Sequence, residues 1–470
     1  MKIPRHAFRE YDIRGVADTE LSDEVAGALG RSFAAVLLEN RGVAAASPPR
    51  VVVGRDGRLS SERLFAALKE GLLEAGVDVI GVGVGPSPLL YFAAHHLGTE
   101  GAVMITASHN PAPDNGFKLM RGKASFFGAD IQSLVDRMEQ AGAALPPVRR
   151  GHFEERDLEA AYVEAVRRSS RFDPAPAVPV RFVIDGGNGS AGPLGVSTLR
   201  ALGFDPEAIY CDIDGTFPNH HPDPTVPANL EALRRRVLES GAQLGVAWDG
   251  DGDRLGAVDE TGEIVWGDKL LILFARALLR DHPGATILGE VKCSATLYAD
   301  IEKNGGRPLM WKTGHSLIKT KMKQENALLA GEMSGHMFFA DRWPGFDDAI
   351  YATVRLLEIV AREGKGLREL LADVPVTCST PEIRVDCPEA IKFDVVRRVL
   401  ARYWPTHKVA DIDGARIDFG DGAWGLCRAS NTGPILVLRF EARTEARRDE
   451  IRRDVEEAVA DAIRRAVGAP

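Results

Sequence analysis

The stretch LGVAWDGDGDR, residues 244–254, joins a short apolar segment to a loop that carries three carboxylates. Its first five residues are apolar without helical spacing, which is typical of a buried strand. Asp249, Asp251 and Asp253 alternate with glycines and repel one another, so we expect them outside the core, curled around a small divalent cation. Arg254 follows directly and offers a positive group to an anion. The stretch therefore predicts a metal and anion site at the end of a strand.

Two other interpretations of this loop are weaker. A solvated turn is the usual explanation for a run of aspartate and glycine. An EF-hand calcium loop would begin at Asp249 and place Glu260 at its twelfth position. That loop needs glycine at position six and an apolar residue at position eight, where this chain has Arg254 and Gly256. A catalytic metal loop is therefore favoured over a calcium-binding protein.

Length and composition exclude several classes of protein. A chain of 470 residues is long enough for several domains with their own cores. The net charge of −9 is spread without long runs, so neither nucleic acid nor a membrane surface is predicted as a partner. An apolar leader and a bilayer-length apolar stretch are not evident, which together with scattered cysteines predicts a cytoplasmic protein with reduced thiols. The cysteines are Cys211, Cys293, Cys378, Cys387 and Cys427.

The pattern along the chain predicts α/β domains followed by a smaller α+β domain. Strands are expected at 51–53, 77–84 and 101–106, and helices at 61–75 and 88–97. A second unit opens with RFVIDGGNGSAG, and a third has strands at 286–291 and 327–330. The last part has antiparallel strands at 415–419, 423–428 and 434–442, and a helix at 444–467. The predicted fold class is α/β, with three similar mixed α/β domains and a C-terminal α+β domain, bounded at 1–153, 154–258, 259–374 and 375–470.

The loop TASHNP, residues 106–111, follows an apolar strand and is expected to place Ser108 on an exposed bend. An ordinary turn is the usual explanation for a lone serine. A serine hydrolase is disfavoured, because His109 is adjacent in sequence and no GxSxG motif surrounds the serine. A serine together with a triple-aspartate metal loop instead suggests phosphoryl transfer through a phosphoserine. Lys118 is close enough in sequence to reach the same phosphoryl group.

Two further loops predict a binding site for a phosphorylated sugar. In GEMSGH, residues 331–336, the side chains of Glu332, Ser334 and His336 alternate, so an extended loop would project them to one side toward vicinal hydroxyls. In RASNTGP, residues 428–434, a guanidinium, small donors and glycine backbone suit a phosphate dianion. The competing interpretations are a solvated turn for the first loop and a plain hairpin turn for the second.

These motifs, taken in order, resemble the α-D-phosphohexomutases, and within them the bacterial phosphomannomutase/phosphoglucomutase group. The resemblance runs from YDIRG, residues 11–15, through TASHNP, DGDGDR, WKTGHSLIK at 311–319 and GEMSGH to RASNTGP, which is essentially the whole chain. It implies four domains around one central cleft, each donating one loop. The last domain would be a mobile lid.

The resemblance also assigns roles to individual residues. The residues implied in phosphoryl and proton transfer are Ser108, Lys118, Arg254, His109 and His336, with the general acid and base left open. The implied Mg²⁺ ligands are Ser108, through a phosphoserine oxygen, and Asp249, Asp251 and Asp253. The implied substrate-binding residues are Tyr11, Arg14, Lys292, His315, Glu332, Ser334, Arg428, Ser430, Asn431 and Thr432.

The implied reaction interconverts hexose 1-phosphate and hexose 6-phosphate, of mannose and glucose, through a 1,6-bisphosphate intermediate. Hexose phosphates are then the partners, Mg²⁺ the cofactor and glucose 1,6-bisphosphate the activator, and we expect a monomer. Two alternatives stay open. A phosphoglucosamine mutase would have similar loops but differ after Glu332, where this chain has Met333. A metal-dependent sugar phosphatase would hydrolyse the phosphoenzyme, and the distal phosphate loop argues against it.

Overall fold

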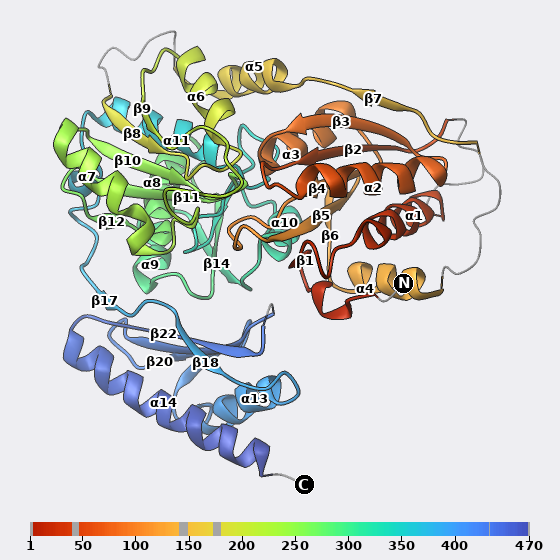
Figure 1. The fold of residues 1–470 in the computed structure, drawn as a ribbon. Helices are drawn as coiled ribbons and strands as arrows, with labels where there is room; N and C mark the ends of the chain where they lie inside the picture. Colours follow the sequence, from red (N-terminus) through yellow and green to blue (C-terminus); the bar gives the residue numbers. More distant parts are fainter. Residues whose placement is uncertain (1–2, 40–46, 141–148, 173–179, 432, 469–470) are drawn as a thin grey trace. The chain divides into compact units, whose positions relative to one another are not determined.

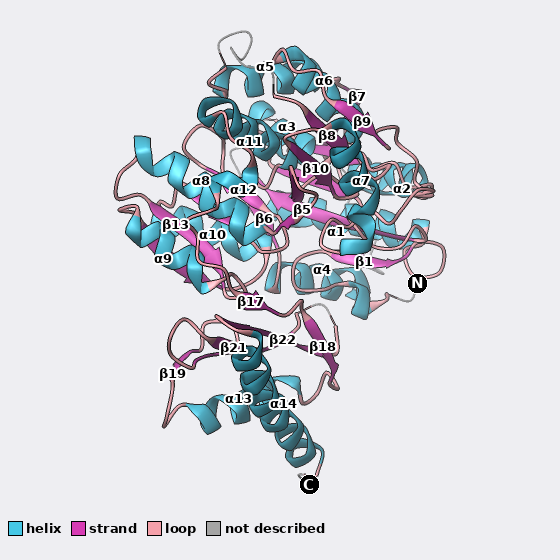
Figure 2. Cartoon of the chain, turned by 90° about the vertical axis from the view of Figure 1, so that its left-hand side faces the viewer, coloured by secondary structure: helices cyan, strands magenta, loops and turns pink. Residues whose placement is uncertain are grey.

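The computed structural model describes residues 3–39, 47–140, 149–172, 180–431 and 433–468. They form two compact units, Met1–Phe274 with Ser334–Leu370, and Ala275–Met333 with Leu371–Pro470. Helices and strands alternate through most of the described chain. Figure 2 shows the helices in cyan and the strands in magenta. No helix within the described ranges is both long and apolar enough to cross a membrane.

The first sheet of the first unit contains β1 (Ile13–Val16), β2 (Arg50–Arg55), β3 (Asp78–Val84), β4 (Gly101–Ile105), β5 (Asp114–Arg121), β6 (Ala124–Phe126) and β7 (Phe153–Glu155). Its order is β1-β5-β4-β2-β3-β7, and β6 pairs with β5. Strands β2, β3 and β4 are parallel, and β5 runs antiparallel to β4. The loop between β4 and β5 carries the predicted phosphoserine.

The helices of this region are α1 (Asp23–Glu39), α2 (Ser61–Glu74), α3 (Ser87–Leu97) and α4 (Ala129–Gln140), with a short 3-10 helix at Arg5–Ala7. Buried apolar side chains of α1, α2 and α4 form one core with the sheet, including Phe33, Phe65 and Leu134. Helix α3 packs against β2 and β4 (Figure 1). The sheet is therefore positioned by helices, and its loops are left to carry chemistry.

The second sheet contains β8 (Phe182–Asp185), β9 (Glu207–Ile209), β10 (Leu244–Trp248), β11 (Leu255–Asp259) and β12 (Ile264–Val265), in the order β12-β11-β10-β8-β9. Strand β10 is wholly buried between parallel β8 and antiparallel β11, which accounts for its continuous apolar sequence. The helices of this part are α5 (Glu159–Ser169), α6 (Gly192–Ala201), the short 3-10 helix Pro227–Leu230 and α7 (Glu231–Ser240). The metal loop begins directly after β10.

Helix α11 (Ala349–Glu363) also belongs to the first unit and packs against β10 and β11. Asp348 caps its N-terminus by accepting the Tyr351 N–H at 2.9 Å. The Trp248 indole N–H, at the end of β10, donates to Thr353 on this helix at 3.0 Å. The remaining elements nearby are α8 (Gly267–Asp281), β16 (Met337–Phe339) and α12 (Leu367–Leu370). The start of the metal loop is therefore fixed from the helix side as well as within the sheet.

In the second unit β13 (Thr286–Glu290) lies between two parallel neighbours, β14 (Arg307–Trp311) and β15 (Leu329–Gly331). Helices α9 (Ala295–Lys303) and α10 (His315–Glu325) connect these strands. Ser294 caps α9 by accepting the Thr296 N–H. This arrangement, a strand followed by a helix and a parallel strand, places the loops after β13, β14 and β15 at one edge.

The C-terminal sheet contains β17 (Cys378–Ser379), β18 (Ile383–Asp386), β19 (Lys408–Ala410), β20 (Ala415–Asp418), β21 (Trp424–Ala429) and β22 (Ile435–Ala442). Its long path is β17-β22-β21-β20-β19, and all pairings are antiparallel. Helices α13 (Lys392–Tyr403) and α14 (Glu445–Val467) cover one face of it (Figures 1 and 2). The loop between β21 and β22 is the predicted phosphate loop.

The predicted fold class is confirmed: three α/β domains, each built on one sheet, are followed by a smaller α+β domain. Each strand and helix predicted from the sequence is present within a few residues of its expected position. The expected antiparallel strands near the C-terminus are β20, β21 and β22. The C-terminal helix begins at Glu445, because Thr444 caps it by accepting the Arg447 N–H.

Candidate active site

The three aspartates of the loop after β10 are buried, so the expectation that they lie outside the core is wrong. Asp249, Asp251 and Asp253 are each 0 % exposed. Burial is tolerated because Lys118 Nζ, on β5, lies 2.6 Å from Oδ2 of both Asp251 and Asp253, and Ser87 donates a further hydrogen bond to Asp251. Burial lowers the pKa of Lys118, but these two carboxylates raise it well above its ordinary value. The lysine therefore stays charged beside the loop.

The loop is closed by its own first aspartate. Asp249 Oδ1 accepts the backbone N–H groups of Asp253 and Arg254, each at 3.0 Å. Gly252 takes the left-handed conformation, with φ of 73°, that lets the chain turn this tightly. The closure brings one carboxylate oxygen from each aspartate within 4.8 Å of the others.

The donor set fits a hard divalent cation. The Oδ1 atoms of Asp251 and Asp253 are buried and accept no hydrogen bond from the described residues. Burial, followed by the charges of Asp253 and Asp251, raises the pKa of Asp249 well above its ordinary value. A cation such as Mg²⁺ takes carboxylate oxygens as ligands and would relieve this repulsion.

Ser108 lies against the metal loop, in the loop between β4 and β5. Its hydroxyl donates to Asp249 Oδ2 at 2.7 Å. The prediction of an exposed bend is wrong, because Ser108 is 1 % exposed and its carbonyl faces Gly250 of the metal loop. Its φ of 52° is left-handed, a conformation that non-glycine residues seldom adopt and that is common at functional sites. The serine and the aspartates therefore form one buried group.

His109 is the second polar neighbour of the serine. Its Nδ1 lies 3.0 Å from Ser108 Oγ. Burial, and then the charges of Arg254 and Arg14, lower the pKa of His109 well below its ordinary value, so the ring is neutral near pH 7. Since the Ser108 hydroxyl gives its hydrogen to Asp249, Nδ1 of the neutral ring donates to the serine oxygen.

Arg58 fixes the serine loop and was not predicted from the sequence. Its two Nη atoms donate to four backbone carbonyls, those of Ser108, Asn110, Pro111 and Asp114, at 2.6–3.0 Å. Its Nε donates to Asp56 at 3.1 Å, so all five N–H groups of the guanidinium are used. The Arg58 side chain is 0 % exposed. Its only sequence signal is an Asp-Gly-Arg turn after a predicted strand, which does not indicate such a contact.

Arg14, from the YDIRG motif, contacts the serine loop. Arg14 donates to Asn110 Oδ1 at 2.9 Å and to the Ala107 carbonyl at 3.2 Å, and it pairs with Asp12 at 2.7 Å. Tyr11 is half-buried, two residues before β1 begins. The structure therefore brings Arg14 to the serine loop, as the predicted site requires.

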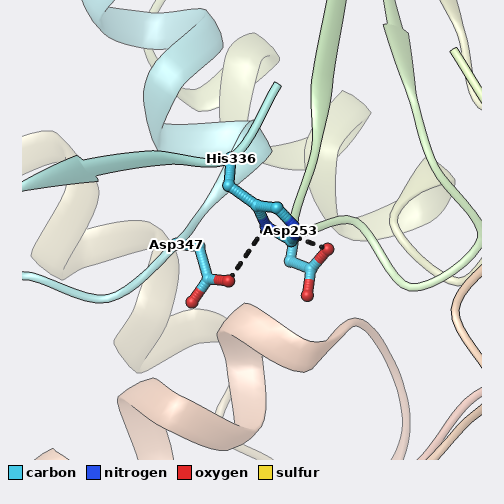
Figure 3. Close-up of side chains that lie close together, drawn as sticks. All are labelled: Asp253, His336 and Asp347. Atoms are coloured by element: carbon cyan, nitrogen blue, oxygen red, sulfur yellow. Dashed lines mark ion pairs between the residues drawn. The ribbon is translucent and has the colours of Figure 1, made fainter. Parts of the chain in front are cut away.

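Arg254 and His336 form a second polar group beside the aspartates. Figure 3 shows His336 with Asp253 and Asp347. Arg254 Nε donates to His336 Nε2 at 3.0 Å. Nδ1 lies 3.0 Å from Asp347 and 3.5 Å from Asp253. Asp347 is fully buried and was not predicted. Ser334, two residues before the histidine, is half-buried.

The GEMSGH loop is not extended, so the predicted one-sided projection of its alternating side chains is wrong. Residues 333–335 form a turn, and Gly335 has a φ of 98°. Glu332, in the second unit, is 3 % exposed, and its Oε1 accepts the Gly314 N–H at 2.7 Å. Glycine at the end of β15 and at the turn lets the backbone bend where an extended run was expected.

Lys292 lies in the loop after β13, and His315 is the first residue of α10, after the loop that follows β14. Lys292 Nζ lies 2.5 Å from Glu382 Oε1 and 3.9 Å from Glu290. Burial lowers the pKa of Lys292, but Glu290 and Glu382 raise it to about 12, and Lys292 in turn lowers the pKa of Glu382 to about 2. His315 is half-buried at the start of α10, with Nδ1 3.3 Å from Lys319 Nζ. Glu382 and Glu290 were missed by the sequence analysis.

The RASNTGP loop is a hairpin with a basic group on each side. Arg428, the last arginine of β21, is 5 % exposed and pairs with Asp413 at 2.9 Å. Lys392, which was not predicted, donates to the Ser430 carbonyl at 2.5 Å and to the Gly433 carbonyl at 3.2 Å. Ser430 is buried and Asn431 half-buried, while Thr432 lies outside the described residues. The hairpin interpretation and the phosphate-loop interpretation are therefore compatible.

Three mixed α/β sheets, a smaller C-terminal domain and a buried serine on a triple-aspartate loop are typical of enzymes that move a phosphoryl group through serine. This chain belongs to the phosphoglucomutase/phosphomannomutase family. The family's α/β/α domain I matches residues 5–143, domain II matches 160–262, domain III matches 266–377, and the C-terminal domain matches 382–458.

Individual relatives agree with this assignment. The chain is 45 % identical over 451 residues to the phosphomannomutase/phosphoglucomutase of Pseudomonas aeruginosa, which covers 96 % of this chain and 94 % of the relative. It is 42 % identical over 447 residues to the phosphoglucomutase of Neisseria gonorrhoeae, with 94 % of each chain covered. A crystal structure of a family protein from Burkholderia thailandensis is similar, with a TM-score of 0.89, 41 % identity and 98 % of each chain covered.

Proposed function

We propose that this protein interconverts hexose 1-phosphates and hexose 6-phosphates, with mannose and glucose as the sugars. The observation that carries the proposal is the 2.7 Å hydrogen bond between Ser108 and Asp249, within a buried group of three aspartates and one lysine. The relatives named phosphomannomutase/phosphoglucomutase support the reaction and both sugars. Glucose 1,6-bisphosphate is the proposed activator, and the cytoplasm and a monomeric state are proposed for the protein.

Phosphoryl transfer runs between Ser108 and the free sugar hydroxyl. In the active form Ser108 carries the phosphoryl group. The sugar oxygen forms a bond to phosphorus, the bond from phosphorus to Ser108 Oγ breaks, and the sugar hydroxyl loses its proton to a neighbouring base. His109 and His336 are the candidate bases, and the neutral His109 ring has the protonation state that a base requires. The bisphosphate then turns around and returns its other phosphoryl group to Ser108.

Charges around Ser108 suit the transferring group. Asp249, Asp251 and Asp253 would hold Mg²⁺ together with a phosphoserine oxygen, and the cation would neutralise phosphoryl oxygens during transfer. Arg254 and Lys118 supply positive charge in addition. Arg58 holds the serine in its left-handed conformation, so that the reacting oxygen is oriented before substrate binds.

Sugar and distal phosphate binding are assigned to the loops of Glu332 and Arg428. A carboxylate and a hydroxyl, from Glu332 and Ser334, would grip the O3 and O4 hydroxyls, because a rotation that exchanges C1 with C6 roughly exchanges these two. Such a grip leaves C2 without a contact and accounts for activity on both mannose and glucose. Arg428, Ser430, Asn431 and Thr432 would bind the phosphate that is not being transferred, with Lys292, His315, Arg14 and Tyr11 as further contacts.

A kinetic comparison tests the proposal against its two alternatives. We would measure kcat/KM on mannose 1-phosphate, glucose 1-phosphate and glucosamine 1-phosphate, with Mg²⁺ and a trace of glucose 1,6-bisphosphate, and follow inorganic phosphate release in the same reactions. High and comparable values on the first two substrates support the proposal. A preference for glucosamine 1-phosphate would assign the chain to the phosphoglucosamine mutases, and stoichiometric phosphate release would assign it to the phosphatases.

The serine itself is tested by Ser108→Ala. The substitution removes the atom that accepts the phosphoryl group, so nearly all turnover should be lost while the protein stays folded. Near-normal turnover by this variant would remove Ser108 from the mechanism.

A further inference from the structure

Two segments that the proposed reaction does not use both contact the metal loop. The first is the glycine-rich DGGNGS turn after β8, and the second is the segment 219–222. The N–H of Ser190, in the first segment, donates to the Gly250 carbonyl at 3.0 Å. The carbonyl of Pro222, in the second segment, accepts the Gly250 N–H at 3.1 Å. Gly250 lies between the proposed ligands Asp249 and Asp251, so both peptide groups of this glycine are fixed by these segments.

Gly189 packs directly against the metal loop. A Cβ built on Gly189 would lie 2.8 Å from the Gly250 carbonyl oxygen, so a side chain there would force a shift. A Cβ on Gly187 would lie 3.1 Å from the Cβ of Pro222, and the φ of 54° at Gly187 is left-handed, which favours glycine. Gly189 therefore brings the turn into backbone contact with the metal loop, and Gly187 brings it against Pro222. A shift of either segment is transmitted to the loop without a flexible side chain between them.

An ion pair joins the two segments to each other. His220 Nε2 lies 3.1 Å and 3.0 Å from the two carboxylate oxygens of Asp185, the last residue of β8. Asp185 is fully buried, and the His220 side chain is 15 % exposed. Asn219 adds a neutral link, because its amide donates to Asn188 Oδ1 at 2.7 Å. These two contacts therefore link the two segments that hydrogen-bond to Gly250.

The contacts of the imidazole require two ring hydrogens. Nδ1 lies 3.0 Å from the His221 carbonyl, which only accepts, and Nε2 faces the carboxylate of Asp185, which also accepts the Gly187 N–H at 2.9 Å. Burial lowers the pKa of His220, but the hydrogen bond and charge of Asp185 outweigh it, and the pKa is raised. The other titratable groups near this ion pair are the Tyr210 ring, 5.6 Å from the imidazole, and Cys211, whose thiol pKa is raised to about 12 by burial and by Asp185.

We infer that the Asp185–His220 ion pair is a positioning device for the metal loop, and that divalent cation affinity weakens when His220 loses its second ring hydrogen. The inference rests on the proposed role of Asp249, Asp251 and Asp253 as metal ligands. His220 and Asp185 do not touch the metal. They act through Pro222 and Ser190 on the peptide groups of Gly250.

The direction of the pH effect follows from the raised pKa. The bound proton stabilises the folded arrangement fully below the ordinary pKa of histidine, near 6.5, and this contribution is lost as the pH rises through the higher folded-state pKa. Titration of the aspartate ligands changes metal affinity in every variant alike. The ratio of the dissociation constants of variant and wild type therefore isolates the contribution of His220.

The test measures Mn²⁺ binding to the full-length protein by calorimetry or electron paramagnetic resonance, from pH 6 to pH 9, without substrate. His220→Gln and Asp185→Asn are the test variants. His221→Gln is the matched control. His221 is the next residue in the sequence, and its side chain makes no hydrogen bond among the described residues. We expect the two test variants to raise the dissociation constant on the order of 10-fold at pH 6 to 6.5, the size typical of residues that orient metal ligands. For His220→Gln the ratio should fall toward 1 by pH 9.

Each outcome decides one point. If wild type and His221→Gln fail to bind Mn²⁺, the proposed metal site itself is wrong. If they bind and the two test variants bind equally well across the pH range, the positioning inference is refuted. A ratio that is raised but does not change with pH would refute the protonation part. Thermal unfolding of each metal-free variant identifies any variant that fails to fold. Asn219→Ala, which weakens the neutral link alone, then gives the second test. A normal Mn²⁺ affinity of this variant at every pH would argue against the positioning of Gly250 by the two segments.

Discussion

Replacing Gly250 with alanine probes the contact between the serine loop and the metal loop. Gly250 lies between two proposed metal ligands, and its backbone does not adopt the left-handed conformation. The substitution therefore adds a methyl group without straining the local backbone. That methyl group would lie 2.3 Å from the carbonyl oxygen of Ser108.

The size of the effect follows from this distance. Real Cβ contacts below 3.0 Å are essentially never seen, so the Ser108 carbonyl must move by at least about 0.7 Å, the difference between 3.0 and 2.3 Å. The carbonyl cannot move freely, because it accepts a hydrogen bond from Arg58 at 2.8 Å. A misplacement of about 1 Å at a reacting group costs on the order of 100-fold in rate, or roughly 2.7 kcal/mol of transition-state stabilisation.

The assay is steady-state conversion of glucose 1-phosphate, with Mg²⁺ and glucose 1,6-bisphosphate, for Gly250→Ala and a matched glycine variant. Gly30→Ala is the control, because its Cβ would lie 2.5 Å from the Leu68 carbonyl, between two helices that carry no proposed site residue. Both variants should lower Tm. Only Gly250→Ala should lower kcat about 100-fold, with KM changed much less because the substrate phosphate is bound elsewhere.

A kcat for Gly250→Ala within 3-fold of wild type, with a folded protein, would refute the argument that the serine must stay fixed against the metal loop. An equal loss of kcat in Gly30→Ala would show that crowding of any glycine lowers activity through stability alone. The comparison therefore separates a positional effect from a general one.

Three other predictions follow from the site. Arg58→Lys keeps the charge but offers three hydrogen-bond donors in place of five, so kcat should fall on the order of 10-fold or more with a small change in KM. A wild-type kcat for this variant would contradict the role of Arg58 in holding the serine loop. Arg428→Ala should raise KM for hexose phosphates at least about 10-fold, the value of one charged hydrogen bond, and an unchanged KM would remove Arg428 from phosphate binding. Because Lys292 lowers the pKa of Glu382 to about 2, the ion pair stabilises the protein above about pH 4.5 and is lost as the pH falls toward 2. Glu382→Gln should therefore lower Tm at pH 7 and much less at pH 3, and an equal difference at both values would count against the pair.

Much of the fold could be predicted, because short runs of apolar residues in the sequence indicate strands that are buried on both faces. Strand β10 has five apolar or small residues in a row and lies at the centre of its sheet, so its sequence alone identified it. Polar loops directly after apolar strands then indicated the serine, metal and phosphate loops. These predictions depend only on neighbours in sequence.

The environment of the site could not be predicted, because it depends on residues far apart in sequence. Lys118 approaches Asp251 across 133 positions, and this contact is what makes burial of the aspartates tolerable. Arg58 reaches the Ser108 carbonyl across 50 positions, so a turn that was expected to be exposed is instead enclosed. Asp347 and Glu382 were missed for the same reason, since a lone carboxylate in a sequence does not reveal its partner.

In the proposed reaction Ser108 carries a phosphoryl group, and the enclosure of this serine would limit how a newly made chain acquires that group. A protein kinase must draw an extended segment around the target hydroxyl into its own cleft, and the loop of Ser108 is 1 % exposed at the serine and tied by Arg58 through four carbonyls. Under the proposed reaction, a small sugar bisphosphate that enters the site would be the donor that suits this geometry. The fraction of chains that are ready to work would then follow the supply of that bisphosphate, a compound that the proposed reaction itself makes.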